Sequence, residues 1–134
     1  MTVKQMRLVV TADDYDAAVA FYRDVLGMPE EAAFSGDGGR VAILQAGRAT
    51  LEIADHKHAD YVDAVEVGSR VAGHSRVAFE VEDAEAATDR VAGEGVEVIA
   101  PPTLTPWNSL NSRLAGPAGL QLTLFEELGE EASG

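Results

Sequence analysis

The chain has 134 residues, a length typical of one domain that buries a core without disulfide or metal support. It contains no cysteine, which excludes a disulfide framework and a thiolate metal site. The formal net charge of −13 disfavours nucleic-acid phosphates and anionic membranes as partners, which leaves a small molecule or another protein. Because there is no apolar run long enough to span a bilayer and no hydrophobic leader, we expect a cytoplasmic protein.

The first half of the chain is predicted to contain a strand, a helix and further strands. Residues 7–12 read as a strand, and Asp13 and Asp14 follow as candidate helix caps. A helix over residues 14–26, ending at Gly27, is predicted by the apolar spacing of Ala18, Val19, Tyr22, Val25 and Leu26. A weak strand at residues 32–34, a glycine-rich turn and a hairpin of residues 40–45 and 49–54 complete this half.

The second half begins after residues 56–73, a connection that contains either a short helix or irregular chain. In residues 76–80, Val77 and Phe79 alternate with polar or small side chains, which predicts a half-buried strand. Asp83 is placed to cap a helix over residues 83–94. A strand at residues 97–100 should end at Pro101 and Pro102, and residues 111–115 and 119–125 should form a closing hairpin around residues 116–118. The acidic segment 127–134 is expected to be a solvated or disordered tail.

The two halves repeat one pattern. Arg7 and Arg76 are separated by the same interval (76 − 7 = 69) as Asp14 and Asp83 (83 − 14 = 69). We therefore predict a single domain, residues 1–134, made of one module at residues 3–55 and another at residues 74–126. One module cannot both cover its sheet and close off the other face, so two copies must pair, within the chain or between chains.

Three motifs carry a family resemblance: residues 20–27 (AFYRDVLG) after the first strand, residues 81–83 before an alanine-rich helix, and residues 116–122 before the last strand. With these motifs the chain resembles the vicinal oxygen chelate superfamily, which includes glyoxalases, extradiol dioxygenases and bleomycin-resistance proteins. The resemblance covers about residues 3–126. It implies an α+β fold of paired βαβββ modules, whose mixed sheets curl around a cavity, in a homodimer.

In metal-dependent members of that superfamily, each module supplies a histidine on its first strand and a glutamate on its last. The resemblance places Arg7 and Arg76 at the histidine positions, and Glu52 and Thr123 at the glutamate positions. A guanidinium has no lone pair for a cation, so we predict that no metal is bound. We also expect no other cofactor. The alternative is a slipped alignment in which His74 and Glu52 bind a metal.

Two other histidines, His56 and His58, have a spacing that metal sites use, but we interpret them as part of a solvated loop.

Strand alternation predicts which side chains face the cavity and which face the helices. The first set is Arg7, Val9, Thr11, Thr50, Glu52, Ala54, Arg76, Ala78, Gln121, Thr123 and Phe125. The second set is Leu8, Val10, Leu51, Ile53, Val77, Phe79, Leu120, Leu122 and Leu124. We expect Glu52 to pair with Arg7 or Arg76, because an unpaired carboxylate in a cavity is unfavourable. The alternative is that these charges only hold the sheet together.

Residues 101–113 hold three prolines and the single tryptophan, which is typical of a rigid rim. Trp107 could stack on a planar ligand or, alternatively, plug the end of the sheet or a dimer seam. The predicted ligand-binding set is Arg7, Val9, Phe34, Glu52, Arg76, Trp107, Asn108, Asn111, Gln121 and Thr123.

Three functions remain open. The first is a metal-free binding protein that sequesters an aromatic or natural-product drug and so confers antibiotic resistance, the acidic composition favouring a cationic or neutral ligand. The second is an isomerase or lyase, with or without metal, in which Glu52 is the general base and Arg7 or Arg76 stabilises an oxyanion. The third is a dimeric interaction module without a ligand, which a filled cavity would favour.

Overall fold

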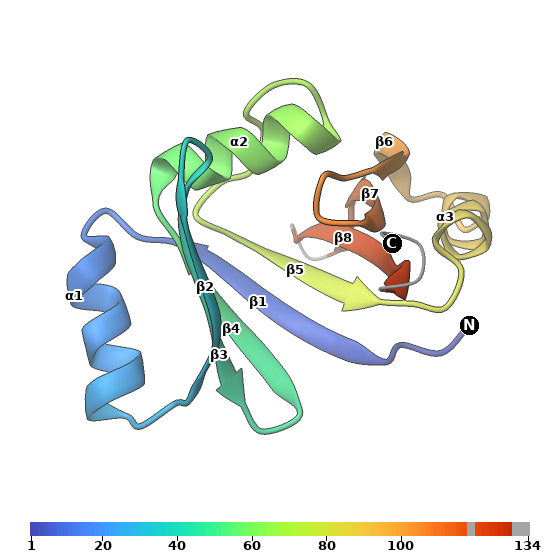
Figure 1. Ribbon diagram of the computed structural model, residues 1–134. Helices are drawn as coiled ribbons and strands as arrows, with labels where there is room; N and C mark the ends of the chain where they lie inside the picture. The colour runs from blue at the N-terminus through green and yellow to red at the C-terminus, as the bar shows by residue number, and fades with distance from the viewer. Residues whose placement is uncertain (118–119, 130–134) are drawn as a thin grey trace.

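The computed structural model describes residues 1–117 and 120–129 of the chain (Figure 1). Its elements, in chain order, are β1 (Gln5–Thr11), α1 (Tyr15–Val19), the π-helical η1 (Ala20–Val25), β2 (Glu30–Gly36), β3 (Gly39–Ala46), β4 (Ala49–Ala54), α2 (His56–Glu66), β5 (Ser75–Glu80), α3 (Ala84–Gly93), β6 (Glu97–Leu104), β7 (Ser109–Ala115) and β8 (Gln121–Glu127). Within the described ranges, no helix has the length and apolar character needed to cross a membrane.

All eight strands belong to one mixed sheet with the order β2-β3-β4-β1-β5-β8-β7-β6. In each module the last strand pairs in parallel with the first, β4 with β1 and β8 with β5. The modules meet where β1 and β5 pair antiparallel, with Leu8 opposite Val77. Both modules of one chain therefore share one sheet, and the predicted α+β fold of two curled modules is confirmed.

Helices cover the outer face of this sheet, as the strand alternation predicted. Figure 1 shows α1 outside one arm of the curl and α3 outside the other. Ile53 and Leu51 pack with Val19 of α1, while Leu124 and Phe79 pack with the alanines of α3. Two residues assigned to this face depart from the expectation, because Leu8 is 38% exposed and Leu120 is 44% exposed.

The repeat extends to the helix caps. The carboxylate of Asp14 accepts a hydrogen bond from the Ala17 N–H, and that of Asp83 accepts one from the Ala86 N–H, both at 3.0 Å. Each aspartate satisfies an amide that a helix start leaves without a partner. The two modules therefore begin their helices in the same way, as their shared interval predicted.

The first helix differs from the prediction in its second half. It continues as η1, in which the Leu26 N–H donates to the Phe21 carbonyl five residues back. A π-turn rotates the side chains that follow out of α-helical phase. Val25 and Leu26, predicted on the packed face, are consequently 72% and 58% exposed.

Two further segments correct the predictions. β6 does not end at Pro101 but runs through both prolines to Leu104. Proline is tolerated there because β6 is an edge strand, where a missing N–H need not leave a neighbouring carbonyl without a partner. At the other end, Glu127 is the last residue of β8 rather than the start of a tail. The predicted turn residue Ala118 and the tail residues 130–134 lie outside the described residues.

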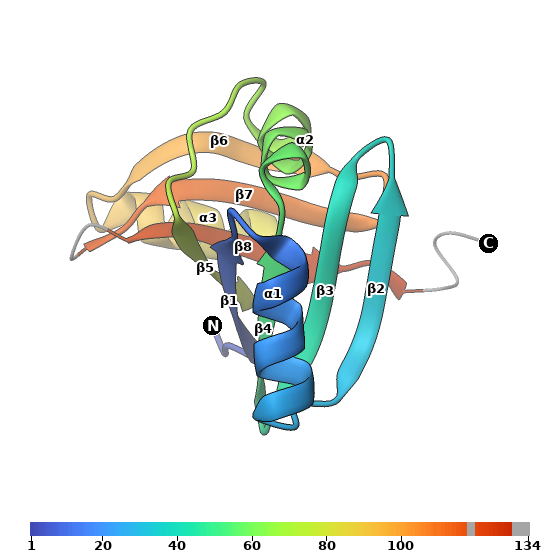
Figure 2. The ribbon, with the colours of Figure 1, turned by 90° about the vertical axis from the view of Figure 1, so that its left-hand side faces the viewer.

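The connection between the modules contains a true helix. Residues His56–Glu66 form α2, with the Asp55 carboxylate capping the His58 N–H at 2.8 Å. This helix contacts β3 and β4 of the first module and β6 and β7 of the second. Figure 1 shows it across the top of the curl, between the arm covered by α1 and the arm covered by α3, and Figure 2 shows it at the same end of the molecule. It therefore forms a roof over the concave face.

Candidate functional site

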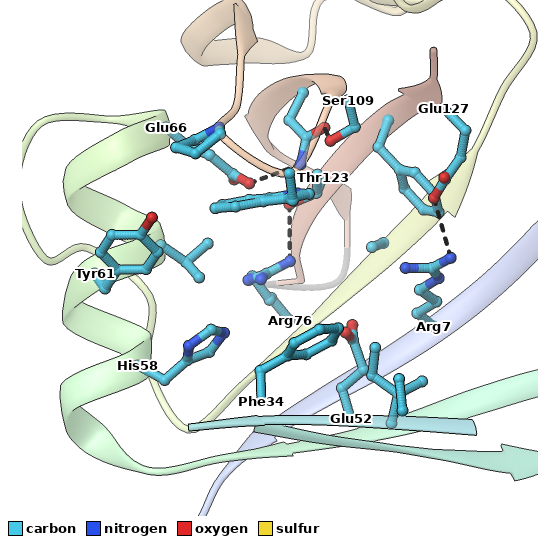
Figure 3. Close-up of a pocket in the computed structure, with 18 of the residues that line it drawn as sticks. Arg7, Phe34, Glu52, His58, Tyr61, Glu66, Arg76, Ser109, Thr123 and Glu127 are labelled. Atoms are coloured by element: carbon cyan, nitrogen blue, oxygen red, sulfur yellow. Dashed lines mark hydrogen bonds and ion pairs between the residues drawn. The ribbon is translucent and has the colours of Figure 1, made fainter. Parts of the chain in front are cut away.

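A cavity of about 560 Å³ lies between the concave face of the sheet, α2 and the β6–β7 turn (Figure 3). Its lining is formed by Arg7, Glu31, Ala32, Phe34, Ile43, Glu52, His58, Tyr61, Val62, Glu66, Arg76, Ala78, Pro106, Trp107, Ser109, Asn111, Thr123, Phe125 and Glu127. This volume is in the range of pockets that hold small molecules. The site is therefore shared by both modules and the helix between them.

Most of the predicted ligand-binding residues come together in this cavity, namely Arg7, Phe34, Glu52, Arg76, Trp107, Asn111 and Thr123. Three do not line it. Val9 is buried and borders a smaller pocket behind Arg76. The Gln121 amide is used by Arg113 and the Val71 carbonyl, and the Asn108 amide donates to the Gly129 carbonyl.

Arg76 keeps hydrogen-bond donors that the described residues do not use. Its Nη1 donates to the Thr123 hydroxyl at 3.0 Å, and within the described residues it forms no ion pair. Burial lowers the pKa of Arg76, but an arginine still keeps its charge near neutral pH. Its remaining N–H donors can therefore bind an oxygen of a ligand.

Arg7, the residue at the same position in the other module, is already paired. Its guanidinium donates to Gln5 at 2.8 Å and to Glu127 at 3.3 Å, and lies 4.6 Å from the centre of the Phe125 ring. Arg7 is thus held at the mouth of the cavity.

The expected pairing of Glu52 with Arg7 or Arg76 is wrong. In the part of the chain that the structure describes, Glu52 forms no ion pair with either arginine, because Arg7 is drawn to Glu127 instead. Glu52 is half-buried and lines the cavity together with His58 and Arg76, and in the view of Figure 3 the Phe34 ring lies between Glu52 and His58. Its carboxylate is therefore available to a ligand.

A buried ion cluster, missed at the level of sequence, fixes the roof. Arg113 is fully buried and donates to Asp63 at 2.8 Å and to Glu66 at 2.6 Å. Burial alone would raise the pKa of Asp63, but hydrogen bonds from the Ala72 and Val71 N–H groups and from Arg113 lower it overall. The cluster joins α2 to β7 and so sets the height of the cavity.

The amide of Asn111, predicted to bind the ligand, is taken up by this same region. Its Nδ2 donates to Glu66 at 2.7 Å and its Oδ1 accepts from the Ser109 hydroxyl at 2.6 Å. Asn111 lines the cavity but acts there as a structural residue.

The two histidines of α2 do not form a solvated loop. His56 is exposed and its Nε2 contacts Asp13 at 2.6 Å, whereas His58 is half-buried and lines the cavity. Residues two apart on a helix point to different sides, so these imidazoles cannot bind one ion together. The prediction is corrected for both residues, because a helix replaces the loop.

Aromatic side chains form part of the rim. The Trp107 ring lies 6.1 Å from the Tyr61 ring, tilted by 50°, and the tryptophan remains 43% exposed. Phe34 faces the cavity and is 62% exposed. Trp107 therefore presents an accessible indole surface at the cavity, as the stacking alternative requires.

The family model for the Glyoxalase/Bleomycin resistance protein/Dioxygenase superfamily matches residues 4–124. The chain belongs to this superfamily. No curated protein matches it in a sequence search.

Solved structures of this superfamily's fold resemble the chain throughout its length. Streptomyces coelicolor methylmalonyl-CoA epimerase in complex with 2-nitronate-propionyl-CoA is 21% identical, with a TM-score of 0.70, over 96% of this chain and 100% of that one. The epimerase from Mycobacterium tuberculosis is 20% identical, with a TM-score of 0.66, over 98% and 91% of the two chains. A hypothetical protein, BH1468 from Bacillus halodurans C-125, is 15% identical, with a TM-score of 0.70, over 96% of each chain. At these identities the likeness establishes the fold.

The metal position of the superfamily is filled here by residues that do not fit a divalent cation. Arg7, Glu52, Arg76 and Thr123 all line the cavity, so two guanidiniums face the space that a metal would need. His74 is exposed, precedes β5 and does not line the cavity, so it is not brought together with Glu52. Over residues 1–117 and 120–129, no three or more His, Asp or Glu side chains lie close enough together to hold a metal ion.

Proposed function

We propose that this protein binds a planar aromatic small molecule in its central cavity without a metal ion, and sequesters it. The proposal depends on one observation. In a cavity of about 560 Å³, Arg76 and Glu52 keep hydrogen-bonding groups that the described residues do not use. Both side chains are half-buried, and a partly desolvated charge that lacks a full set of partners favours a ligand that supplies them. An unfilled cavity also disfavours the third hypothesis, a pure interaction module.

The walls indicate what kind of molecule fits. Trp107 and Phe34 offer exposed aromatic faces at the rim, and Ile43, Val62 and Phe125 line the cavity with apolar surface. A flat ring can pack among these groups, while Arg76 and Thr123 orient one polar edge of it. A drug or other natural product with an aromatic core meets this description, which supports a role in resistance to such a compound.

The proposal is tested by titrating the protein with a panel of planar aromatic acids, quinones and phenols. Calorimetry and Trp107 fluorescence measure the binding. For compounds that bind, Arg76→Met should weaken affinity by about tenfold or more, because a hydrogen bond to a charged group is lost. Arg90→Met, at an exposed position of α3, is the matched control. A panel without heat signal, quenching or thermal shift would contradict the proposal.

An enzymatic role is the second candidate, favoured by the free carboxylate of Glu52 beside a cationic Arg76. This pairing could remove a proton next to a carbonyl and stabilise the resulting oxyanion. The structural relatives include methylmalonyl-CoA epimerases, so methylmalonyl-CoA is a direct compound to test. Incorporation of deuterium from D₂O that is lost in Glu52→Gln would support the enzyme, and its absence would leave the binding role.

A further inference from the structure

The tautomer of His58 follows from its contact with the β2–β3 turn. Its Nδ1 lies 2.9 Å from the Gly38 carbonyl oxygen. A carbonyl oxygen only accepts hydrogen bonds, so Nδ1 must carry the proton. In the neutral imidazole, Nε2 then bears a lone pair.

The position of His58 is fixed from two sides. The Asp55 carboxylate accepts hydrogen bonds from the His58 N–H at 2.8 Å and the Arg40 N–H at 3.1 Å. Gly39, with φ of +81°, brings the turn so close that a Cβ there would collide with the backbone of His58. The turn and the first turn of α2 therefore form one rigid unit.

The surroundings keep this imidazole neutral. Burial lowers the pKa of His58 and the charge of Arg76 acts in the same direction, while the Gly38 carbonyl, Glu52 and Asp55 oppose them without reversing the effect. Figure 3 shows the ring extending from α2 into the cavity toward Arg76 and Phe34. A hydrogen-bond acceptor therefore faces the cavity, opposite the donors of Arg76.

We propose that His58 recognises the ligand by accepting a hydrogen bond at Nε2 from a hydroxyl or N–H group on the ring. Arg76 binds an oxygen of the same molecule. This inference rests on the proposed binding function and narrows its ligand class to aromatic molecules with both a donor and an oxygen acceptor, such as hydroxyaryl carboxylates. Arg76, which forms no ion pair within the described residues, supplies a local positive charge for such a carboxylate, so this ligand class departs from the cationic or neutral ligand that the acidic composition favoured. His58 and Arg76 together discriminate such molecules from analogues that lack the donor.

The first experiment reads the tautomer without any ligand. In nitrogen-15-labelled protein at about pH 7.5, long-range proton–nitrogen correlation should show His58 protonated at Nδ1 and unprotonated at Nε2. The resonances are assigned by their loss in His58→Asn. An Nε2-protonated ring or an imidazolium would overturn the inference, whatever the cavity binds.

The second experiment compares the affinity for 6-hydroxy-2-naphthoate with that for 2-naphthoate by calorimetry. The wild type should prefer the hydroxylated probe by about three- to tenfold, the effect of one hydrogen bond. His58→Asn keeps a donor for the Gly38 carbonyl, but its shorter side chain places no acceptor at the Nε2 position, so the preference should fall to about one. His58→Gln, whose amide oxygen can approach the Nε2 position, should restore part of it, and the exposed His56→Asn should retain it in full.

The outcomes separate the two proposals. Binding of both probes with equal affinity, or a preference that survives in His58→Asn, would overturn the role of His58 and leave the binding function standing. Failure of the wild type to bind either probe, together with a negative aromatic panel, would overturn both.

Discussion

At the scale of residues, two arginines at equivalent positions have different roles because their neighbours differ. Arg7 is close enough to Glu127 and the Phe125 ring to have its charge satisfied within the chain. Among the described residues, the Arg76 side chain donates to the Thr123 hydroxyl alone and keeps further donors for the cavity. The repeat therefore sets where a guanidinium is placed, and the surrounding side chains decide whether it serves structure or binding.

His58 also couples pH to stability. Because burial lowers its folded-state pKa below the ordinary histidine value, the unfolded chain takes up a proton first on acidification. The neutral imidazole therefore makes its full contribution to the free energy of unfolding above about pH 6.5. That contribution is lost as the pH falls from there through the folded-state pKa. Urea unfolding at several pH values should show a shallower decline for His58→Asn than for the wild type.

His74→Asn, at an exposed histidine outside the cavity, serves as the control and should follow the wild type. Parallel pH profiles for His58→Asn and the wild type would contradict the burial argument.

At the scale of elements, α2 determines the cavity because it supplies the roof and His58. The position of α2 depends in turn on its ion pairs with strand β7. Arg113 and its two carboxylate partners have exposed side-chain fractions of at most 1%, so solvent cannot replace a lost partner. The Nε of Arg113 has no hydrogen-bond partner among the described residues, so the cost of burying this guanidinium is not fully compensated. Such a cluster specifies where the helix docks more than it adds net stability.

Arg113→Met should lower the free energy of unfolding by about 3–5 kcal/mol, because Glu66 stays buried without its cation and Asp63 keeps only the Arg70 guanidinium, 3.9 Å away, among the described residues. Urea unfolding measures the loss, and amide exchange in α2 should speed up more than exchange in α3. Arg90→Met, on the exposed face of α3, should change stability by less than about 0.5 kcal/mol. A loss for Arg113→Met as small as that of the control would show that the cluster does not hold the helix.

At the scale of the whole molecule, the two modules share one sheet through the antiparallel pairing of β1 and β5. Helix α2 adds contacts to both modules above the same seam. Neither half can unfold without exposing the other's first strand and the roof. The molecule should therefore behave as one cooperative unit.

Unfolding followed by Trp107 fluorescence, which reports the second module, should coincide with unfolding followed by far-ultraviolet circular dichroism. Two separated transitions would show that the modules are independent. The same experiment at about 2 µM and about 100 µM tests the predicted homodimer, because dissociation on unfolding makes the midpoint rise with protein concentration.

The sequence by itself determined what depends on near neighbours. The alternation of residues 76–80 and the shared interval from Arg7 to Arg76 were sufficient to place the cavity-facing arginines, and Asp14 and Asp83 act as the predicted helix caps. These features follow from side-chain periodicity and backbone hydrogen bonding within a few residues. The tertiary structure alone decided what depends on distant partners: Glu127 rather than Glu52 meets Arg7, Arg113 meets Asp63 across 50 positions, and the Gly38 carbonyl selects the tautomer of His58. Those contacts depend on which surfaces meet when the sheet curls, and no local pattern in the chain records that.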